Sequence, residues 1–305
     1  MSKIFITGIR GFLGAHLANQ LSKEGHQILG IDNLFHPSSN KIPKQMWHWG
    51  DVRYYPHVSS YIANADVTIH TAAQIHVDQS INDPNFTLDT NVNGTLTILE
   101  ACRKFNKRLL LASSSEVYGS ALTAKITEDH PLNGHSPYAA TKTAADRLAY
   151  SYWVTYKLPV TIIRNFNIFG AHQSFDSYGG VIAKFTYAAL KGMAPKIFGD
   201  GTQERDYMNV QDAVEAYKTC LTNKDTIGKA INFGSGTTIT INDLATLIVK
   251  EINPSLIPEH VDPRPGEVQK LQADITVAES LGFKPTTDFT RDLKEYIVWF
   301  RSNSL

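Results

Sequence analysis

The chain has 305 residues, of which 42% are apolar and 19% charged, so it is long enough to bury a sizeable core. Lysine plus arginine and aspartate plus glutamate both total 29, which leaves no net field to recruit nucleic acid or an anionic membrane. The two cysteines, Cys102 and Cys220, cannot form a disulfide scaffold and do not cluster like metal ligands. We therefore expect a reduced, cytoplasmic protein without a metal site. The chain start lacks the apolar stretch of a secretory signal, and no run approaches the roughly 18 apolar residues of a membrane span.

Short runs rich in isoleucine, valine and leucine recur along the first half of the chain, and a stretch with helical periodicity separates each run from the next. The runs read KIFIT, QILGID, DVTIHTAA, LLLASSS and PVTIIRN. The clearest helices are expected at Phe12–Lys23, Asn85–Lys104 and Pro137–Lys157, the last with proline in its first turn. This alternation predicts an α/β fold, a doubly wound parallel sheet with helices on both faces.

The strict alternation ends after RNFNIFG. A helix-like GGVIAKFTYAALKG, a strand-like RDYMNV, a helix around DAVEAYKTCL and a proline-rich HVDPRPGEV follow. We expect a smaller α+β cap laid on the sheet. The predicted division gives one domain of residues 1–171, to which residues 205–233 return, and a second domain of residues 172–204 and 234–305.

A glycine-rich turn links the first expected strand to the first expected helix. Gly8, Gly11 and Gly14 form GxxGxxG, which lets backbone N–H groups and a helix N-terminus approach a pyrophosphate closely. The second strand ends on Asp32, at the distance where a carboxylate accepts hydrogen bonds from an adenosine ribose. The two features together favour a dinucleotide, and the carboxylate favours NAD over NADP. The alternatives are a ligand-free turn and a merely polar strand end, and Arg10 could contact a phosphate of either cofactor.

A second pattern places possible catalytic groups at the carboxyl edge of the sheet. Tyr138 and Lys142 lie four residues apart on one face of a predicted helix, where an ammonium within reach favours the phenolate. One helix earlier, a strand ends in a run of polar side chains: Ser113, Ser114, Ser115 and Glu116. Alone, the tyrosine and lysine could be an aromatic residue packed beside a solvated lysine. Together with the polar run, they indicate a site for acid–base chemistry.

These motifs resemble those of the extended short-chain dehydrogenase/reductases that modify nucleotide sugars. The likeness runs almost end to end, in order, through the following segments: TGIRGFLG, HTAAQIHVDQS, TNVNGTLTILEA, SSSEVYG, SPYAATK, RNFNIFG, GDGTQERDYMNV and RPGEV. The resemblance implies a Rossmann domain that binds NAD, a cap that binds a nucleotide-diphosphate sugar, and one of three activities: 4-epimerase, 4,6-dehydratase or sugar-acid decarboxylase.

Carried over by position, the resemblance implies a role for each matching residue. Tyr138 takes the proton of the sugar 4-hydroxyl, Lys142 activates it and anchors the nicotinamide ribose, and Ser114 orients O4. NAD would contact these two residues and a longer set: Gly8, Arg10, Gly11, Phe12, Leu13, Gly14, Asp32, Asn33, Asp51, Val52, Ala72, Ala73, Asn91 and Ser113. The substrate would contact His76, Asn167, Arg205 and Arg264, although each arginine could instead be a surface ion-pair partner.

The residue that best discriminates among the activities is Glu116. It stands two positions after Ser114, where 4,6-dehydratases of this group typically carry the base that removes the C5 proton. Ser115 departs from the glucose-type pattern, which has an aspartic acid there to protonate the leaving oxygen. The sequence most resembles amino-sugar 4,6-dehydratases, with 4-epimerase and then decarboxylase as alternatives. A non-catalytic NAD-binding scaffold, and a Glu116 turned away to pair with Arg147, also remain open.

The resemblance also implies a homodimer. The helices at 88–104 and 137–157 would pair with their symmetry mates in a four-helix bundle, a common form of two-fold interface. The sequence offers four apolar residues as contacts, some of which must instead face the sheet: Leu96, Leu99, Leu148 and Trp153.

Overall fold

The computed structural model describes residues 1–176, 179–264 and 266–303. Its main feature is a seven-stranded, all-parallel sheet in the order β11-β6-β5-β4-β1-β2-β3. The strands have these bounds: β1 Lys3–Thr7, β2 Gln27–Asp32, β3 Trp47–Trp49, β4 Val67–His70, β5 Arg108–Ser114, β6 Val160–Asn165 and β11 Ala230–Phe233. The predicted doubly wound sheet is therefore confirmed.

Helices cover both faces of the sheet, and each face has its own apolar core. One core packs α1 (Phe12–Lys23) and α8 (Val210–Thr222) on the sheet, and the other packs α2 (Tyr55–Asn64), α5 (Gly94–Phe105) and α6 (Pro137–Tyr156). Successive residues of β1 serve the two cores in turn: Ile4 and Ile6 pack in the first, and Phe5 in the second. Burial on both faces explains why the strands read as continuous apolar runs.

The predicted helices are present, with two differences. The expected helix at 85–104 consists of α4 (Pro84–Leu88), a π-helical segment (Asp89–Asn93) and α5, and α3 (Val77–Asn82) precedes it. The helix α6 begins where predicted, because the Ser136 hydroxyl caps the Ala139 N–H and Pro137 follows at the first helical position. It ends one residue early, since Lys157 has a left-handed φ of 58°.

The elements outside the large sheet and the helices that cover it are short, and most of them form the cap. Short strands pair as β7 (Asn167–Phe169) with β10 (Tyr207–Asn209), β8 (Lys196–Phe198) with β13 (Glu259–Val261), and β9 (Glu204–Arg205) with β12 (Ile239–Thr240) and β14 (Lys270–Leu271). The helices are α7 (Val181–Leu190), α9 (Ile241–Ile252), α10 (Thr276–Ser280) and α11 (Phe289–Asn303), and 3₁₀ turns occupy Lys44–Met46, Ser115–Tyr118 and Lys224–Thr226.

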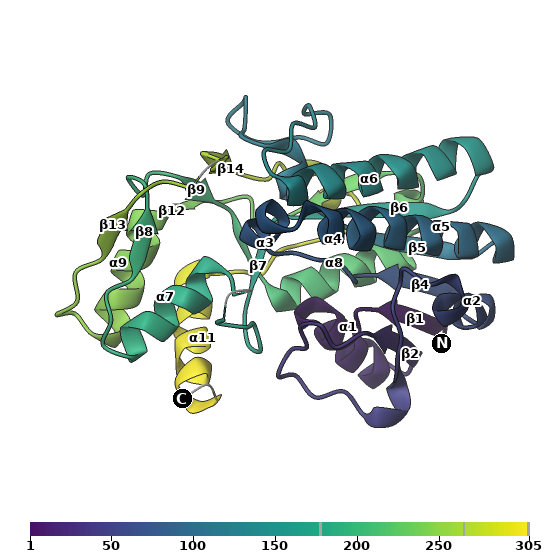
Figure 1. Cartoon of the computed structure of the whole chain (residues 1–305), viewed down its shortest axis with the longest axis horizontal. Helices are drawn as coiled ribbons and strands as arrows, with labels where there is room; N and C mark the ends of the chain where they lie inside the picture. Colours follow the sequence, from purple (N-terminus) through teal and green to yellow (C-terminus); the bar gives the residue numbers. More distant parts are fainter. Residues whose placement is uncertain (177–178, 265, 304–305) are drawn as a thin grey trace.

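The cap lies beside the sheet, with α7, α9 and α11 at the far side from α2 and α5 (Figure 1). Its own apolar core joins α7, α9 and α11. Leu271, Ala273 and Phe283, by contrast, pack in the α1–α8 core of the sheet, so the chain returns to that core after residue 233. The exact domain division stays a prediction.

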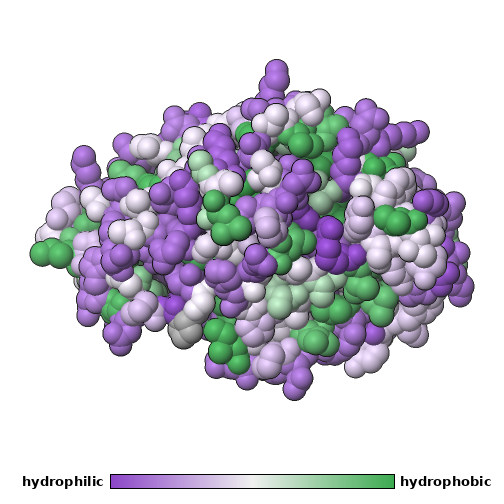
Figure 2. Space-filling model, turned by 90° about the horizontal axis from the view of Figure 1, so that it is seen from above, coloured by the Kyte–Doolittle hydropathy of each residue, from purple (hydrophilic) through white to green (hydrophobic). Residues whose placement is uncertain are grey.

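The surface mixes polar and apolar groups. On the face seen in Figure 2, green apolar side chains stand among purple hydrophilic ones. Within the part of the chain that the structure describes, no helix has both the length and the apolar character needed to cross a bilayer. Cys102 and Cys220 are both buried as free thiols.

One buried carboxylate joins the cap to the sheet. Asp206, between β9 and β10, is fully buried and accepts hydrogen bonds from Ser235 N at 2.8 Å, Gly236 N at 2.9 Å, Ala273 N at 3.1 Å and Ser235 Oγ at 2.7 Å. Those donors belong to the turn after β11 and to the segment after β14. Burial raises the pKa of this carboxyl, and the four hydrogen bonds oppose that shift.

We expect Asp206→Asn to destabilise the fold, because an amide N–H₂ would face buried N–H donors and leave them unsatisfied. The free energy of unfolding should fall by about 2 kcal/mol or more, the scale for buried groups that lose their partners. Urea unfolding followed by circular dichroism measures it. Asp200→Asn is the control, since its carboxylate is exposed and accepts hydrogen bonds from the neighbouring Thr202. Equal stability of the two variants would contradict the linking role of Asp206.

Candidate active site

A cavity of about 940 Å³ opens along the carboxyl ends of the strands, between the sheet and the cap. The ends of β1, β2, β4, β5 and β6 line one side, and α7, β8, β9 and β10 line the other. The carboxyl edge is where open parallel sheets bind ligands. The cavity is therefore the candidate site.

The glycine turn lies at the sheet side of this cavity and its packing requires glycine. A Cβ on Gly14 would lie 2.1 Å from the Gly8 oxygen, and one on Gly8, whose φ is +69°, would lie 2.8 Å from Ala72 Cα. No side chain caps α1 at Gly11, so the first N–H groups of this 12-residue helix keep no side-chain acceptor there. Gly11, Phe12 and Leu13 line the cavity. Such a bare helix N-terminus fits the pyrophosphate of a dinucleotide.

Asp32 ends β2 at the rim of the same cavity. Its two oxygens accept hydrogen bonds from the backbone N–H groups of Arg10, at 2.9 Å, and Leu34, at 2.8 Å. Burial raises the pKa of this carboxyl and the backbone hydrogen bonds lower it. Each oxygen keeps further lone-pair capacity, so the carboxylate can accept hydrogen bonds from a ribose as well.

Most of the residues predicted for the cofactor line the cavity, including Asn33, Val52, Ala72, Ala73 and Ser113. Among the described residues, three of the predicted set do not line it: Arg10, Asp51 and Asn91.

The side chains of these three residues are engaged behind the cavity wall. The Arg10 guanidinium lies over the Trp47 ring, 5.1 Å from its centroid. The Asp51 carboxylate bonds Arg53 at 2.7 Å, and the Asn91 amide bonds the backbone of Gln74. These residues support the wall, and any contact with a cofactor stays a prediction.

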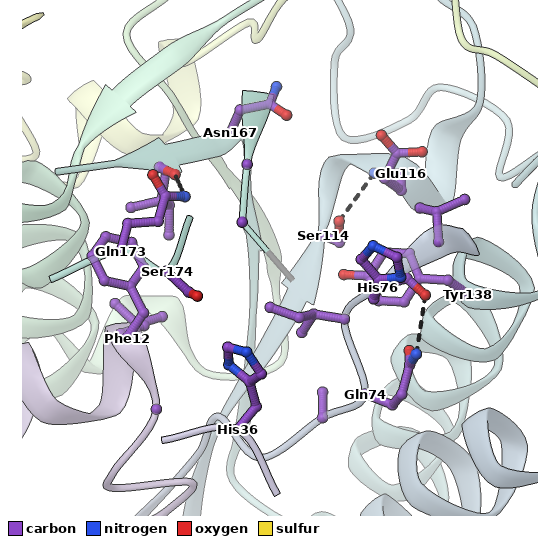
Figure 3. A pocket seen from close by; sticks show the side chains of 18 of the residues that line it. Phe12, His36, Gln74, His76, Ser114, Glu116, Tyr138, Asn167, Gln173 and Ser174 are labelled. Carbon is purple, nitrogen blue, oxygen red and sulfur yellow. Dashed lines mark hydrogen bonds between the residues drawn. The ribbon is translucent and has the colours of Figure 1, made fainter. Parts of the chain in front are cut away.

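The expected catalytic groups converge on one corner of the cavity. Ser114, Glu116 and Tyr138 come from β5, the 3₁₀ turn that follows it, and α6, and His76 lines the same cavity (Figure 3). The Ser114 hydroxyl accepts a hydrogen bond from the Glu116 N–H at 3.2 Å. Ser115, which is buried, lines the same corner.

Burial shifts the pKa values of both Tyr138 and Glu116 toward their neutral forms. Burial raises the pKa of Tyr138 to about 12; a hydrogen bond with Ser114 opposes the shift and the Glu116 charge adds to it. Burial likewise raises the pKa of Glu116, while Arg205 lowers it and Glu267 raises it. A carboxyl shifted upward in this way is suited to move a proton at neutral pH.

Lys142 is buried beside Tyr138 on α6. Its Nζ donates to the Ala112 carbonyl oxygen at 2.6 Å, and burial lowers its pKa to about 8, against an opposing effect of Asp146. Desolvation is thus the largest effect on the Tyr138 pKa in this structure, and the role of Lys142 in favouring the phenolate stays a prediction. The alternative partner of Glu116 is also excluded, since Arg147 pairs with Asp146.

The predicted substrate contacts all line the cavity. Asn167 stands on β7, opposite the catalytic corner (Figure 3). Arg205 is buried and bonds Glu267 at 2.8 Å, so it is not a surface ion-pair partner. Arg264 stacks on the Phe198 ring at 4.0 Å and pairs with Asp78 at 3.7 Å.

Further cavity residues were not predicted from the sequence: Phe35, His36, Lys184, Phe198, Gln203, Tyr207 and Glu267. Gln203 Oε1 and the Tyr207 hydroxyl are buried and have no hydrogen-bond partner among the described residues, so a ligand there would satisfy them. Gln203 and Tyr207 stand in GDGTQERDYMNV and Glu267 in RPGEV, which the sequence analysis had already singled out. These two motifs were the sequence signal from which the three residues could have been predicted.

The fold and the site define a short-chain dehydrogenase/reductase of the extended kind, with a Rossmann sheet, a glycine turn, and a tyrosine and lysine on one helix facing the same cavity. The chain belongs to the NAD dependent epimerase/dehydratase family, whose model matches residues 4–234. Its cofactor is NAD.

Relatives that perform different reactions resemble the chain to similar degrees. It is 32% identical over 316 residues to a UDP-glucose 4-epimerase of Mycolicibacterium smegmatis, covering 99% of both chains. It is 34% identical over 318 residues to a UDP-N-acetyl-alpha-D-glucosaminuronate decarboxylase of Bacillus cytotoxicus, covering 98% of both.

The third is a solved structure, the dTDP-glucose 4,6-dehydratase of Streptomyces venezuelae with NAD bound. It has a TM-score of 0.90 and 27% identity, over 99% of this chain and 97% of that one. Overall similarity therefore assigns the family but does not distinguish the reaction, which has to be inferred from the residues of the site.

Proposed function

We propose that the protein is an NAD-dependent 4,6-dehydratase of a nucleotide-diphosphate sugar. The observation that carries the proposal is Glu116. This carboxyl lines the cavity beside Ser114 and Tyr138, its pKa is raised by burial, and the competing partner Arg147 is engaged elsewhere. A 4-epimerase needs only one acid–base group at O4, whereas a dehydratase also needs a base at C5.

The residues would divide the work as follows. The Ser114 hydroxyl orients the sugar 4-hydroxyl, Tyr138 takes its proton, and Lys142 supplies the positive charge that a buried phenol requires to act as a base. NAD, when bound, would supply the hydride chemistry, with the hydride taken from C4 and returned at C6 while a proton returns to C5. The resulting 4-keto group acidifies C5–H, and Glu116 removes that proton as water leaves from C6.

We assign the two sides of the cavity to the two ligands, NAD and the nucleotide-diphosphate sugar. The glycine turn, Asp32 and Asn33 would hold NAD on the sheet side. Asn167, Arg205 and Arg264 would hold the nucleotide diphosphate on the cap side, where two guanidinium groups offer bidentate donors to phosphate oxygens. Tyr138 and Lys142 at the junction argue against a non-catalytic scaffold.

A 4-epimerase is the second candidate, and Ser115 favours it. Serine stands on the turn after β5 where an acid would protonate the departing C6 oxygen, and a hydroxyl is a far weaker proton donor. An epimerase has no leaving group at C6 and needs no such acid. A decarboxylase, which starts from a sugar acid, is the third candidate.

The first prediction tests Tyr138. Tyr138→Phe should retain the fold and NAD while lowering kcat by about 10²- to 10⁴-fold, the scale for loss of a general acid–base group. Turnover of a panel of UDP-, dTDP-, GDP- and CDP-sugars is followed by product mass. Tyr150→Phe, an exposed tyrosine on the same helix, is the control and should keep full activity. Unfolding of Tyr138→Phe would support a packing role instead.

The second prediction separates the three reactions. Turnover in deuterated water should place deuterium at C5 of a 4-keto-6-deoxy product, since the proton taken by Glu116 exchanges with solvent. Glu116→Gln should still oxidise C4, seen as accumulating NADH absorbance, but should release no water.

The control is a second carboxylate variant, and each alternative reaction gives a different product. Glu267→Gln, in the same cavity, should raise KM through Arg205 and preserve deuterium incorporation. A product inverted at C4, with its 6-hydroxyl intact and no deuterium at C5, would assign the epimerase. Carbon dioxide released from a sugar acid would assign the decarboxylase.

We also propose a homodimer through α5 and α6. Leu96, Tyr150 and Val154 expose apolar surface on these two helices, as does Leu88 at the end of α4. Of the residues predicted as contacts, Leu99 is instead fully buried in the α2–α5–α6 core, and Leu148 packs partly against that core. Trp153 packs against Gly228, where a Cβ would lie 2.4 Å from its ring.

Sedimentation at micromolar concentration should therefore give the mass of two chains. Replacing Leu96 and Val154 together with glutamate should shift the equilibrium toward the monomer, because it places charges in an apolar interface. The same change at the exposed Leu122 and Ile257, away from these helices, is the control. A wild-type monomer would contradict the proposal.

A further inference from the structure

A fully buried carboxylate follows Lys142 on the same helix. Asp146 lies one helical turn after Lys142 on α6, and its side chain is 0% exposed. Its Oδ2 accepts a hydrogen bond from the Ser113 hydroxyl at 2.8 Å and forms an ion pair with Arg164 Nε at 2.9 Å. Asp146 therefore joins α6 to the ends of both β5 and β6.

The partner Arg164 extends this network away from the cavity. Its Nη2 donates to Asp146 Oδ1 at 3.1 Å, and its Nη1 donates to the Tyr118 hydroxyl at 2.7 Å. The Tyr118 hydroxyl donates in turn to Asn232 Oδ1 at 2.6 Å. A structural role as the counter-charge of Arg164 is thus one complete account of Asp146.

The contacts of Lys142 point to a second role. The ammonium donates to the Ala112 carbonyl, and Ala112 directly precedes the Ser113 that Asp146 holds. The acceptor for Lys142 and the donor to Asp146 are consecutive residues of β5. Asp146 thereby fixes the strand end against which the lysine is placed.

Asp146 is the charged group that favours the protonated form of Lys142. On α6, Asp146 raises the lysine pKa, against the desolvation that lowers it to about 8, and Tyr138 on the same helix is a neutral phenol. On β4, the buried His70 bonds Thr7 and Thr95 and is uncharged, with a pKa of about 3. The cations Arg164 on β6 and Arg147 on α6 both pair with Asp146.

We infer that Asp146 is a positioning residue for Lys142: through its charge and its hold on Ser113, it keeps the lysine protonated and aimed at the strand end beside Tyr138. The inference rests on the proposed function only in taking Lys142 as the cation that activates Tyr138. Without Asp146, the desolvated ammonium loses the negative charge that raises its pKa and releases its proton at a lower pH.

The test compares two variants that differ only at residue 146. Asp146→Asn alone would leave the buried Arg164 guanidinium without a counter-charge and threaten the fold. Arg164→Gln removes that cation first, and Asp146 still pairs with the half-exposed Arg147. Arg164→Gln with Asp146→Asn is then compared with Arg164→Gln, and circular dichroism and thermal unfolding confirm that each is native.

The readout is the titration of Lys142 itself, by NMR of protein labelled with ¹³C at lysine Cε, with the signal assigned by its loss in Lys142→Met. We expect the Lys142 pKa of the double variant to lie at least one unit, or tenfold in proton affinity, below that of Arg164→Gln. The alkaline limb of the kcat–pH profile should move by the same amount.

The outcomes are decisive either way. Identical Lys142 titrations in the two folded variants would overturn the inference. So would a double variant that fails to fold while Arg164→Gln folds, because Asp146 would then serve the fold alone. The NMR titration needs no sugar substrate, so it stands whichever reaction the turnover assay assigns.

Discussion

The contact on which the site depends is the close approach of two backbone segments at Gly8 and Gly14. No side chain fits between them, since a Cβ on Gly14 would meet the Gly8 oxygen at 2.1 Å. This approach seats α1 directly against β1 and turns its N-terminal N–H groups toward the cavity. The start of α1 at the carboxyl edge of the sheet follows from that junction.

The site gains its chemistry from burial as much as from the identity of its residues. Tyr138, Glu116 and Lys142 all have pKa values shifted toward their neutral forms, and desolvation is the largest cause for each. Charges placed at the margins oppose these shifts: Arg205 acts on Glu116, and Asp146 acts on Lys142. Burial therefore sets the direction of each pKa shift, and charges on the cap and on α6 limit the shifts of Glu116 and Lys142.

The sequence predicted the sheet, the main helices and the convergence of Tyr138 and Ser114, because these follow from periodicity and from the common carboxyl edge. It did not predict where several side chains point. Arg10 turns onto Trp47 and Leu99 faces the core, outcomes decided by neighbours distant in the chain. The direction of the Tyr138 pKa shift was likewise out of reach, since spacing carries no measure of desolvation.

The alternation of β1 between two cores has a consequence for how such a chain can diversify. Ile4 and Ile6 serve one core and Phe5 the other, so losing or gaining one residue in a strand would exchange the lining of both cores at once. Insertions and deletions within the strands are therefore expected to disrupt the fold. Apart from the glycine turn, the turns at the carboxyl edge of the sheet carry residues such as Ser115 that belong to neither apolar core, so a substitution there does not exchange the core linings. Relatives with this architecture can therefore hold the scaffold constant while their chemistry diverges.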